Sequence, residues 1–259
     1  MTDTFRPAVI RGVEFGTGRP KICVPLTGET VQALADGVAA LDFDIVDLVE
    51  LRIDYFESVD DLDEVVRAVE TVRDGLPDTT PLLFTFRSAP EGGRRDIDPR
   101  AYEKLLLAAV RSGFIDALDV EMFTELGSLE RLVNGSHERG VAVIMSSHDF
   151  EHTPPLEQIV ARLTLQQDLG ADIVKIAVMP EAPSDVLTLL QATEVFSERA
   201  TRPAMTMSMG PLGVLSRLAG ETFGSCATFG SVGEQSAPGQ VDAAALRVTL
   251  DLLHDAQAR

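Results

Sequence analysis

Residues 141–178 read VAVIMSSHDFEHTPPLEQIVARLTLQQDLGADIVKIAV, and this stretch decides the fold. An apolar run at 141–148 is followed by a segment with apolar residues at helical spacing, 156–170, and by a second apolar run at 172–178. Nearly continuous hydrophobic runs are typical of parallel strands covered on both faces, and the helical spacing predicts an amphipathic helix between them. The stretch therefore predicts a strand, a crossover helix and a second, parallel strand.

The same alternation runs along the rest of the chain. Eight such strand–helix units in 259 residues predict a (β/α)8 TIM barrel. A doubly wound open sheet is the alternative, but PLTGET (25–30) is not the GxGxxG turn that such a sheet usually carries. The other strand-like runs are KICVPL (21–26), IVDLVELR (45–52), PLLFTFR (81–87), IDALDVEM (115–122), PAMTMSM (203–209) and GSCATFG (224–230).

The amino-terminal segment VIRGVEFGTGRP (9–20) has the Gly-rich turns of a short β-hairpin. We expect this hairpin to close the lower end of the barrel. No break in composition marks a linker, so we expect one catalytic domain over residues 1–259.

The charge balance restricts the class of partner. Forty-one acidic residues against 22 basic ones give a net charge of −19. Nucleic-acid binding needs a basic stripe, which the sequence lacks, and the same charge disfavours an anionic membrane surface. A solvated surface is the simplest explanation of this charge, with adaptation to salt as the alternative. The sequence has no run of 18 apolar residues and no apolar leader at its start, so we expect no membrane span and a cytoplasmic location.

The two cysteines, Cys23 and Cys226, both lie in apolar runs. We expect them to be buried free thiols, as in a reducing compartment. No CxxC or HExxH motif occurs and the four histidines do not cluster, so the sequence predicts no metal site.

Polar residues that a core would reject collect at the carboxyl ends of the predicted strands. Barrel enzymes build their active sites at this end, from the ends of several strands. One polar strand end is ordinary, but the repetition predicts an active site there. The residues concerned are Glu50, Arg52, Asp54, Arg87, Glu91, Asp119, Glu121, Ser146, His148 and Lys175.

Lys175 is the most unusual of these residues. The chain has only three lysines, and this one lies within the apolar run IVKIAV (173–178). An amine that points into a barrel is poorly hydrated, which favours its neutral form, and a neutral amine can attack a ketone to form a Schiff base. The alternative is a salt-bridged lysine, paired with Glu50 or Glu121.

His148 is a candidate for general acid–base catalysis near neutral pH, with Glu91 orienting its ring. A structural histidine is the alternative. Asp119 and Glu121 are interpreted as a buried structural brace. Residues 233–240, with a Pro-Gly turn, are predicted to form a loop that closes over a ligand, with an ordinary surface turn as the alternative.

Arg52, Arg87 and Arg217 are fork-shaped donors that suit carboxylates and hydroxyls. Each is alternatively an ion-pair partner within the fold. Glu50 lies two residues before Arg52, so the two side chains leave the strand on the same side.

Several segments together resemble the type I 3-dehydroquinate dehydratases, the Schiff-base dehydratases of the shikimate pathway. Each segment alone is weak, but the set covers nearly the whole chain in the family's order. The segments are PKICVPL (20–26), ELRID (50–54), TFRSAPEGG (85–93), SSHDF (146–150), VKIAVMP (174–180), MGPLGVLSR (209–217) and SAPGQ (236–240).

The resemblance implies a barrel without metal or organic cofactor, usually a homodimer, that dehydrates 3-dehydroquinate to 3-dehydroshikimate. It implies that Lys175 is the Schiff-base lysine and that His148 is the acid–base residue with Glu91 as its partner. It further implies substrate contacts from Glu50, Arg52, Arg87, Arg217 and Gln240, and from Ser236 and Ala237 in the closing loop.

Two rival interpretations remain at this point. A class I aldolase of sugar phosphates is also a Schiff-base barrel, but Glu91 and His148 would be surplus in it. A non-catalytic barrel is expected to lack Lys175 or His148, and this sequence has both.

Overall fold

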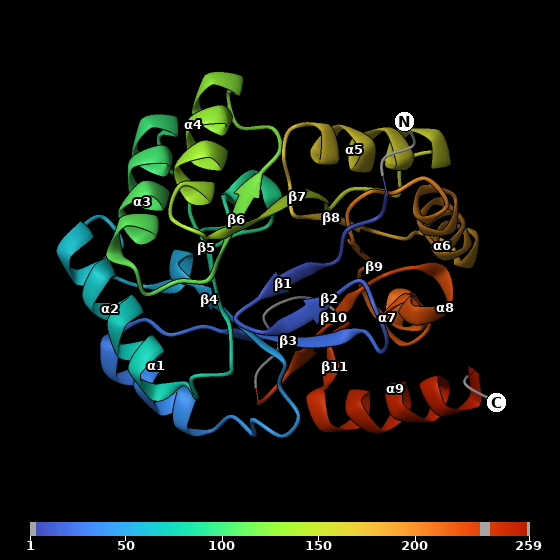
Figure 1. Ribbon diagram of the computed structural model, residues 1–259, viewed down its shortest axis with the longest axis horizontal. Helices are drawn as coiled ribbons and strands as arrows, with labels where there is room; N and C mark the ends of the chain where they lie inside the picture. The colour runs from blue at the N-terminus through green and yellow to red at the C-terminus, as the bar shows by residue number, and fades with distance from the viewer. Residues whose placement is uncertain (1–3, 234–238, 258–259) are drawn as a thin grey trace.

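The computed structural model describes residues 4–233 and 239–257. Within them, parallel strands form a curled sheet in the order β11-β10-β3-β4-β5-β6-β7-β8-β9, and they lie at the centre of Figure 1. Strands β10 and β9 meet where the N–H of Cys226, directly before β10, donates to the carbonyl of Ala204, at 2.7 Å. The sheet therefore closes into a barrel, as the sequence predicts, and the open sheet is excluded. The strands are β3 (Lys21–Leu26), β4 (Leu48–Arg52), β5 (Leu82–Thr85), β6 (Ala117–Glu121), β7 (Ala142–Asp149), β8 (Ile173–Val178), β9 (Ala204–Ser208), β10 (Ala227–Ser231) and β11 (Val241–Asp242).

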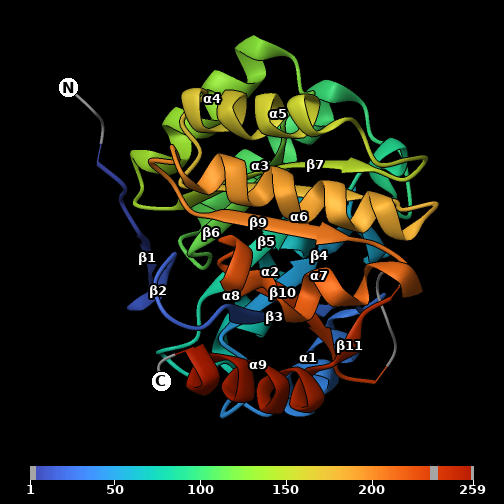
Figure 2. The same cartoon turned by 90° about the vertical axis from the view of Figure 1, so that its right-hand side faces the viewer.

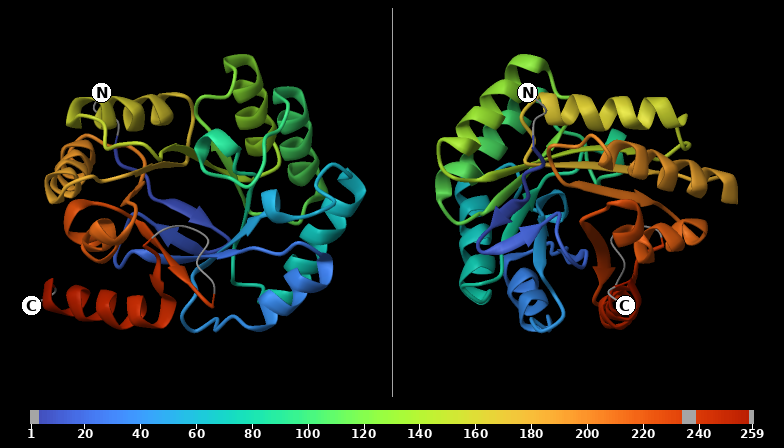
Figure 3. Two further views of the ribbon diagram at one scale, coloured as in Figure 1. Left: turned by 180° about the vertical axis from the view of Figure 1, so that it is seen from behind. Right: turned by 45° about the vertical axis from the view of Figure 1, so that its right-hand side comes forward.

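Helices follow the strands and surround them, as Figures 1 and 3 show. Their ends have clear local causes: the Asp61 carboxylate accepts the first free N–H groups of α2, Asp98 does the same for α3, and α3 ends at Gly113 with a left-handed φ of 77°. The helices are α1 (Val31–Ala39), α2 (Leu62–Gly75), α3 (Pro99–Ser112), α4 (Leu126–His137), α5 (Leu156–Asp168), α6 (Pro183–Ser197), α7 (Val214–Leu218), α8 (Gly220–Phe223) and α9 (Ala243–Gln257), with short 3-10 turns η1 (Ile53–Tyr55), η2 (Ala89–Glu91) and η3 (Pro211–Gly213).

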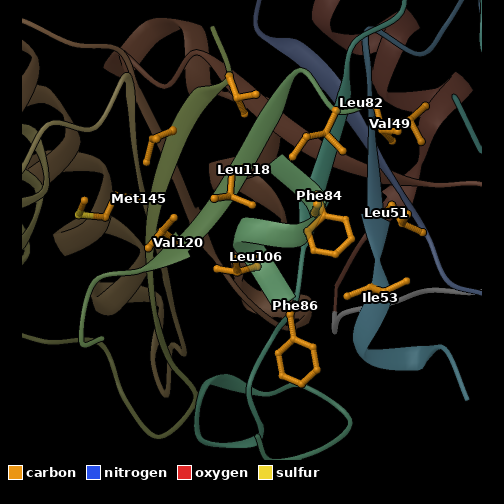
Figure 4. Close-up of a cluster of buried hydrophobic side chains, with 14 of the residues drawn as sticks. Val49, Leu51, Ile53, Leu82, Phe84, Phe86, Leu106, Leu118, Val120 and Met145 are labelled. Atoms are coloured by element: carbon orange, nitrogen blue, oxygen red, sulfur yellow. The ribbon is translucent and has the colours of Figure 1, made fainter. Parts of the chain in front are cut away.

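The main hydrophobic core lies between the strands and the surrounding helices. Alternate strand residues point outward into it, because successive side chains of a strand leave on opposite faces. Figure 4 shows part of this layer, where Leu51, Phe84 and Leu118 from neighbouring strands gather near Leu106 of α3. Burying each such side chain contributes about 1.5–3 kcal/mol relative to leaving it in water.

The predicted amino-terminal hairpin is present as β1 (Ala8–Ile10) and β2 (Val13–Phe15), paired antiparallel. Figure 2 shows it at one end of the barrel. Its buried side chains Ile10 and Phe15 belong to the same cluster as interior residues at or near the starts of the barrel strands. The hairpin therefore fills the amino end of the barrel, and those strand residues are Leu48, Leu83, Ala117, Ile144 and Ile173.

The interior changes character two residues further along each of these strands. The side chains on the same inward face are now polar, and all of them are buried. This switch from an apolar floor to a polar upper layer places the chemistry at the carboxyl end of the barrel. The polar layer consists of Glu50, Thr85, Asp119, Ser146 and Lys175.

Other expectations have mixed outcomes. Cys23 and Cys226 are both buried and unpaired, as expected. Strand β11 was not predicted, because two residues are too short for a strand pattern to register. Over the part of the chain that the structure describes, no helix combines the length and the apolar character needed to cross a membrane.

Candidate active site

A pocket opens at the carboxyl end of the barrel, with a volume of about 600 Å³ that includes its open mouth. Strand ends and the loops after them supply its wall, so residues far apart in sequence meet there. The predicted site residues that line it are Glu50, Arg52, Arg87, Glu91, His148, Lys175, Arg217 and Gln240.

Lys175 points into the barrel and is only 3% exposed. Its Nζ donates a hydrogen bond to Asp119 Oδ2 at 3.0 Å and lies 3.6 Å from Glu50 Oε1. The ring centroid of Phe229 is 4.7 Å from Nζ. The surroundings of this amine are thus buried, as the sequence predicts, but two carboxylates and a ring face lie against it. This is the salt-bridged arrangement that the sequence left open, with Glu50 and Asp119 as its partners. The expectation of a simply apolar pocket is wrong on this point.

Arg87 connects the carboxylates below the pocket. Its Nη2 donates to Asp119 Oδ1 at 2.8 Å, and its Nη1 donates to Glu121 Oε1 at 2.8 Å. Ser146 Oγ donates to the same Asp119 oxygen at 2.6 Å. Burial opposes ionisation of Asp119, but Arg87 and Lys175 beside it keep its pKa below the usual range. Asp119 therefore stays ionised, and its carboxylate fixes the position of the Lys175 amine.

His148 and Glu91 form a second pair at the pocket wall. His148 Nδ1 lies 2.8 Å from Glu91 Oε2, and both side chains are about nine-tenths buried. Because Nδ1 is engaged by Glu91, Nε2 is the ring nitrogen left to act on a bound ligand.

Burial has opposite effects on the two partners of this pair. It lowers the pKa of His148 well below its usual value, and the positive charges of Arg87 and Lys175 lower it further. It raises the pKa of Glu91 to about 8, against the opposing effect of Arg87. Burial thus disfavours the charged form of both partners, and the 2.8 Å contact between them links the protonation of one to that of the other.

Glycines set the path of the loop that carries Glu91. A Cβ on Gly93 would lie 1.7 Å from the carbonyl oxygen of Arg87, which no side chain can occupy. Gly92 has a left-handed φ of 83°, and a Cβ there would meet the Phe150 ring at 2.1 Å. The loop can turn this tightly beside the pocket only because both positions lack a side chain.

Arg217 lies on the short helix α7 and is 2% exposed. The preceding residue fixes this helix to β9, because Ser216 Oγ accepts the N–H of Ser208 at 2.9 Å. Burial lowers the pKa of Arg217 to about 10, so the guanidinium is still a cation at neutral pH. It is suited to receive an anionic group of a ligand.

The structure assembles most of the predicted site, with specific exceptions. Ser236 and Ala237 lie outside the described residues. Glu121 is not among the residues that line the pocket and binds Arg87 and Ser88, whereas Glu50 lines it. Asp119, interpreted from the sequence as a brace, does brace Arg87 but also binds the Lys175 amine.

Sequence reasoning assigned no part of the site to the apolar residues of the wall, and it attributed Met207 and Met209 to packing in the barrel interior. These side chains sit on the same inward face as predicted polar residues, so the two-residue strand period was a usable signal for several of them. Within the described chain, no three His, Cys, Asp or Glu side chains are grouped so as to hold a metal ion. The apolar wall residues without a predicted role in the site are Phe150, Ala177, Met207, Met209 and Phe229.

Comparisons with known proteins agree on one family. The family model for type I 3-dehydroquinase matches residues 22–257. The 3-dehydroquinate dehydratase of Listeria welshimeri is 51% identical over 246 residues, which cover 95% of this chain and 97% of the relative.

Solved structures lead to the same result. The type I 3-dehydroquinate dehydratase of Clostridium difficile, with covalently modified comenic acid, has a TM-score of 0.95 at 42% identity, covering 98% of this chain and all of that one. The 3-dehydroquinate dehydratase of Geobacillus kaustophilus has a TM-score of 0.94 at 35% identity, with both chains fully covered. The chain belongs to the type I 3-dehydroquinase family.

Proposed function

We propose that Lys175 forms the Schiff base through which this type I 3-dehydroquinase converts 3-dehydroquinate to 3-dehydroshikimate. The observation that carries the proposal is the position of Nζ: it is buried in the pocket, 3.0 Å from Asp119 Oδ2, on the strand next to that of His148. An amine held at a fixed point in a pocket attacks a bound ketone without the entropy loss of first being brought into position.

The chemistry begins with the ring ketone of the substrate. Lys175 first gives up one proton of its ammonium group, and the neutral amine adds to the carbonyl carbon. Return of that proton to the carbinolamine hydroxyl, which leaves as water, gives a protonated imine. This cation withdraws electrons from the neighbouring carbon, so its C–H becomes acidic. The fixed negative charge of Asp119 next to Nζ stabilises the iminium as it stabilises the ammonium.

His148 carries the protons of the next two steps. Nε2 removes the acidic proton to give an enamine, and the same imidazolium then protonates the β-hydroxyl as it leaves as water. Glu91, hydrogen-bonded to Nδ1, balances the charge that the ring gains and loses. Hydrolysis of the remaining imine releases the product and restores the Lys175 amine.

The remaining pocket residues are proposed to hold the substrate. Arg217 and Gln240, both buried at the pocket wall, suit the substrate carboxylate. Glu50, Arg52 and Arg87 suit the ring hydroxyls. Because Arg87 also binds Asp119 and Glu121, its larger contribution is to keep these carboxylates in place.

Reductive trapping tests the lysine directly. Borohydride added during turnover reduces the imine to a stable secondary amine, and peptide mass spectrometry should place the adduct on the peptide that contains Lys175. The Lys175→Ala variant should bind substrate, form no adduct and show no gain in enone absorbance. The matched control is Lys104→Ala on the exposed face of α3, which should behave as wild type.

A second variant separates the two roles. His148→Ala should still form the reducible imine, while proton removal and hydrolysis become slow. Wild-type turnover in this variant would refute the acid–base assignment, and absence of an adduct at Lys175 in the wild-type protein would refute the Schiff base.

We also propose that the protein is a homodimer in the cytoplasm. The homodimer is what the family resemblance implies. Light scattering on the purified protein tests it, and the mass of a monomer would contradict it. Buried unpaired Cys23 and Cys226 suit a reducing compartment.

A further inference from the structure

Asp54 is a fully buried carboxylate directly after β4, in the turn η1. Its two oxygens are used symmetrically. Oδ1 accepts from Arg52 Nε at 2.8 Å and from the backbone N–H of Arg87 at 3.3 Å, and Oδ2 accepts from Arg52 Nη2 at 2.9 Å and from the backbone N–H of Arg94 at 3.2 Å. Each oxygen thus binds one guanidinium N–H and one backbone N–H.

The two backbone groups mark the ends of the loop that carries Glu91. Arg87 precedes this loop and Arg94 follows it, and within it the N–H of Gly93 donates to the carbonyl of Ser88 at 2.8 Å. A carboxylate that binds both ends fixes where the loop stands relative to the barrel. The position of Glu91, and through it the ring of His148, therefore depends on Asp54.

The other two contacts orient Arg52. A bidentate carboxylate holds a guanidinium in one plane, so the remaining face and edge of Arg52 are presented to the pocket that it lines. The ring of Tyr55 supports the same arrangement, because the guanidinium carbons of Arg52 and Arg94 each lie 5.3 Å from its centroid.

We propose that Asp54 is a positioning residue that sets the substrate-binding face of Arg52 and the Glu91–His148 pair together. The inference rests on the proposed roles of Arg52, Glu91 and His148. One buried carboxylate then links the residue that binds the ring hydroxyls to the pair that transfers protons. Asp54 itself touches neither the substrate nor the reacting atoms.

The test variant is Asp54→Asn. The carboxamide keeps the shape but replaces one acceptor oxygen by an NH2 group, so one guanidinium N–H and one backbone N–H lose their acceptor. We expect the KM for 3-dehydroquinate to rise about tenfold or more, the loss expected for one charge-assisted hydrogen bond. The acid limb of the kcat/KM profile should also shift, because Glu91 moves relative to His148. The borohydride adduct at Lys175 should still form at saturating substrate.

Asp116 provides a matched control at the opposite end of the barrel. Like Asp54 it accepts from guanidinium and backbone N–H groups, in its case from Arg11 Nε, Arg73 Nη1 and the N–H of Leu82. The Asp116→Asn variant should lose thermal stability but keep the wild-type KM and pH profile, which separates positioning from general support of the fold.

A KM for Asp54→Asn within twofold of wild type, with an unshifted pH profile, would overturn the proposal. If this variant does not fold, Tyr55→Leu decides, because it removes the ring contact to Arg52 and Arg94 and leaves every carboxylate in place. Its KM should rise about threefold, and an unchanged KM would overturn the proposal. These outcomes differ from failure of the proposed function, which would appear as a missing Lys175 adduct in the wild-type protein.

Discussion

His148 Nδ1 and Glu91 Oε2 are 2.8 Å apart in a wall that largely excludes water. A carboxylate at this distance favours the protonated ring, while burial disfavours it. Burial and the contact with Glu91 therefore act in opposite directions on the proton that His148 must lose before it can serve as the proposed base.

The pH profile should reveal this coupling. In Glu91→Gln the carboxylate that favours the imidazolium is gone, while the burial that lowers the pKa of His148 remains. We expect the acid limb of kcat/KM to move to lower pH. We also expect a lower kcat, because no carboxylate then stabilises the positive charge that the ring gains when it takes up a proton. The measurement is kcat/KM from pH 5 to 9 for both proteins, and an acid limb that stays in place or moves upward contradicts the assignment.

Glu91 should also make stability depend on pH. Burial raises its pKa from 4.5 to about 8, so the folded protein binds this proton more tightly than the unfolded chain does. The stabilising contribution is fully present below about pH 4.5 and is lost as the pH rises through about 8. Thermal unfolding of the ligand-free proteins at pH 5 and 8.5 should show a larger drop for wild type than for Glu91→Gln. Equal drops would mean that Glu91 ionises freely in the folded state.

Removing the charge of Asp119 should be costly. The side chain is fully buried and binds two cations, Arg87 and Lys175. Asp119→Asn leaves these cations under-compensated, and we expect a loss of about 3–5 kcal/mol in the free energy of unfolding. Urea titration measures it.

The control for that loss is a pair at the surface. Arg131 binds Glu103 at 2.6 Å, but its side chain is 58% exposed. Glu103→Gln should therefore cost less than about 1 kcal/mol. If the two variants lose similar stability, the charge on Asp119 is not held by the buried network.

The loop glycine Gly93 should be essential for activity. An alanine there must push its Cβ away from the Arg87 carbonyl oxygen, 1.7 Å distant, which moves the loop that carries Glu91. We expect kcat/KM to fall about tenfold to a hundredfold, as displacements of about 1 Å do in other sites. Gly113→Ala is the control, since a Cβ there meets nothing within 4 Å. That variant should lose about 1–2 kcal/mol of stability through its left-handed backbone and keep its kcat/KM.

The fold was predictable because its signals are local and repeated. Each of β3–β10 lies largely within a predicted apolar run, and α5 follows the amphipathic pattern after VAVIMSSH (141–148). The two-residue β11 has no such pattern, and only its pairing with β10 makes it a strand.

The site was predictable to the extent that inward-facing polar residues are unusual. Lys175 and His148 stand out in apolar runs, but the role of Asp119 does not. Whether a carboxylate meets Arg87 alone or also Lys175 depends on the stagger between neighbouring strands, which sequence does not express. The same holds for Asp54, whose partners come from three separate positions along the chain.

The hairpin that closes the amino end of the barrel determines how substrate and product reach the pocket. Ile10 and Phe15 pack against the first interior residues of the strands and close the amino end of the barrel, whereas the pocket opens at the carboxyl end. Reactant must arrive, and the unsaturated acid must depart, by the same rim. Bound product then prevents substrate from entering. We therefore expect 3-dehydroshikimate to be a competitive inhibitor, whose effect is overcome by raising the concentration of 3-dehydroquinate.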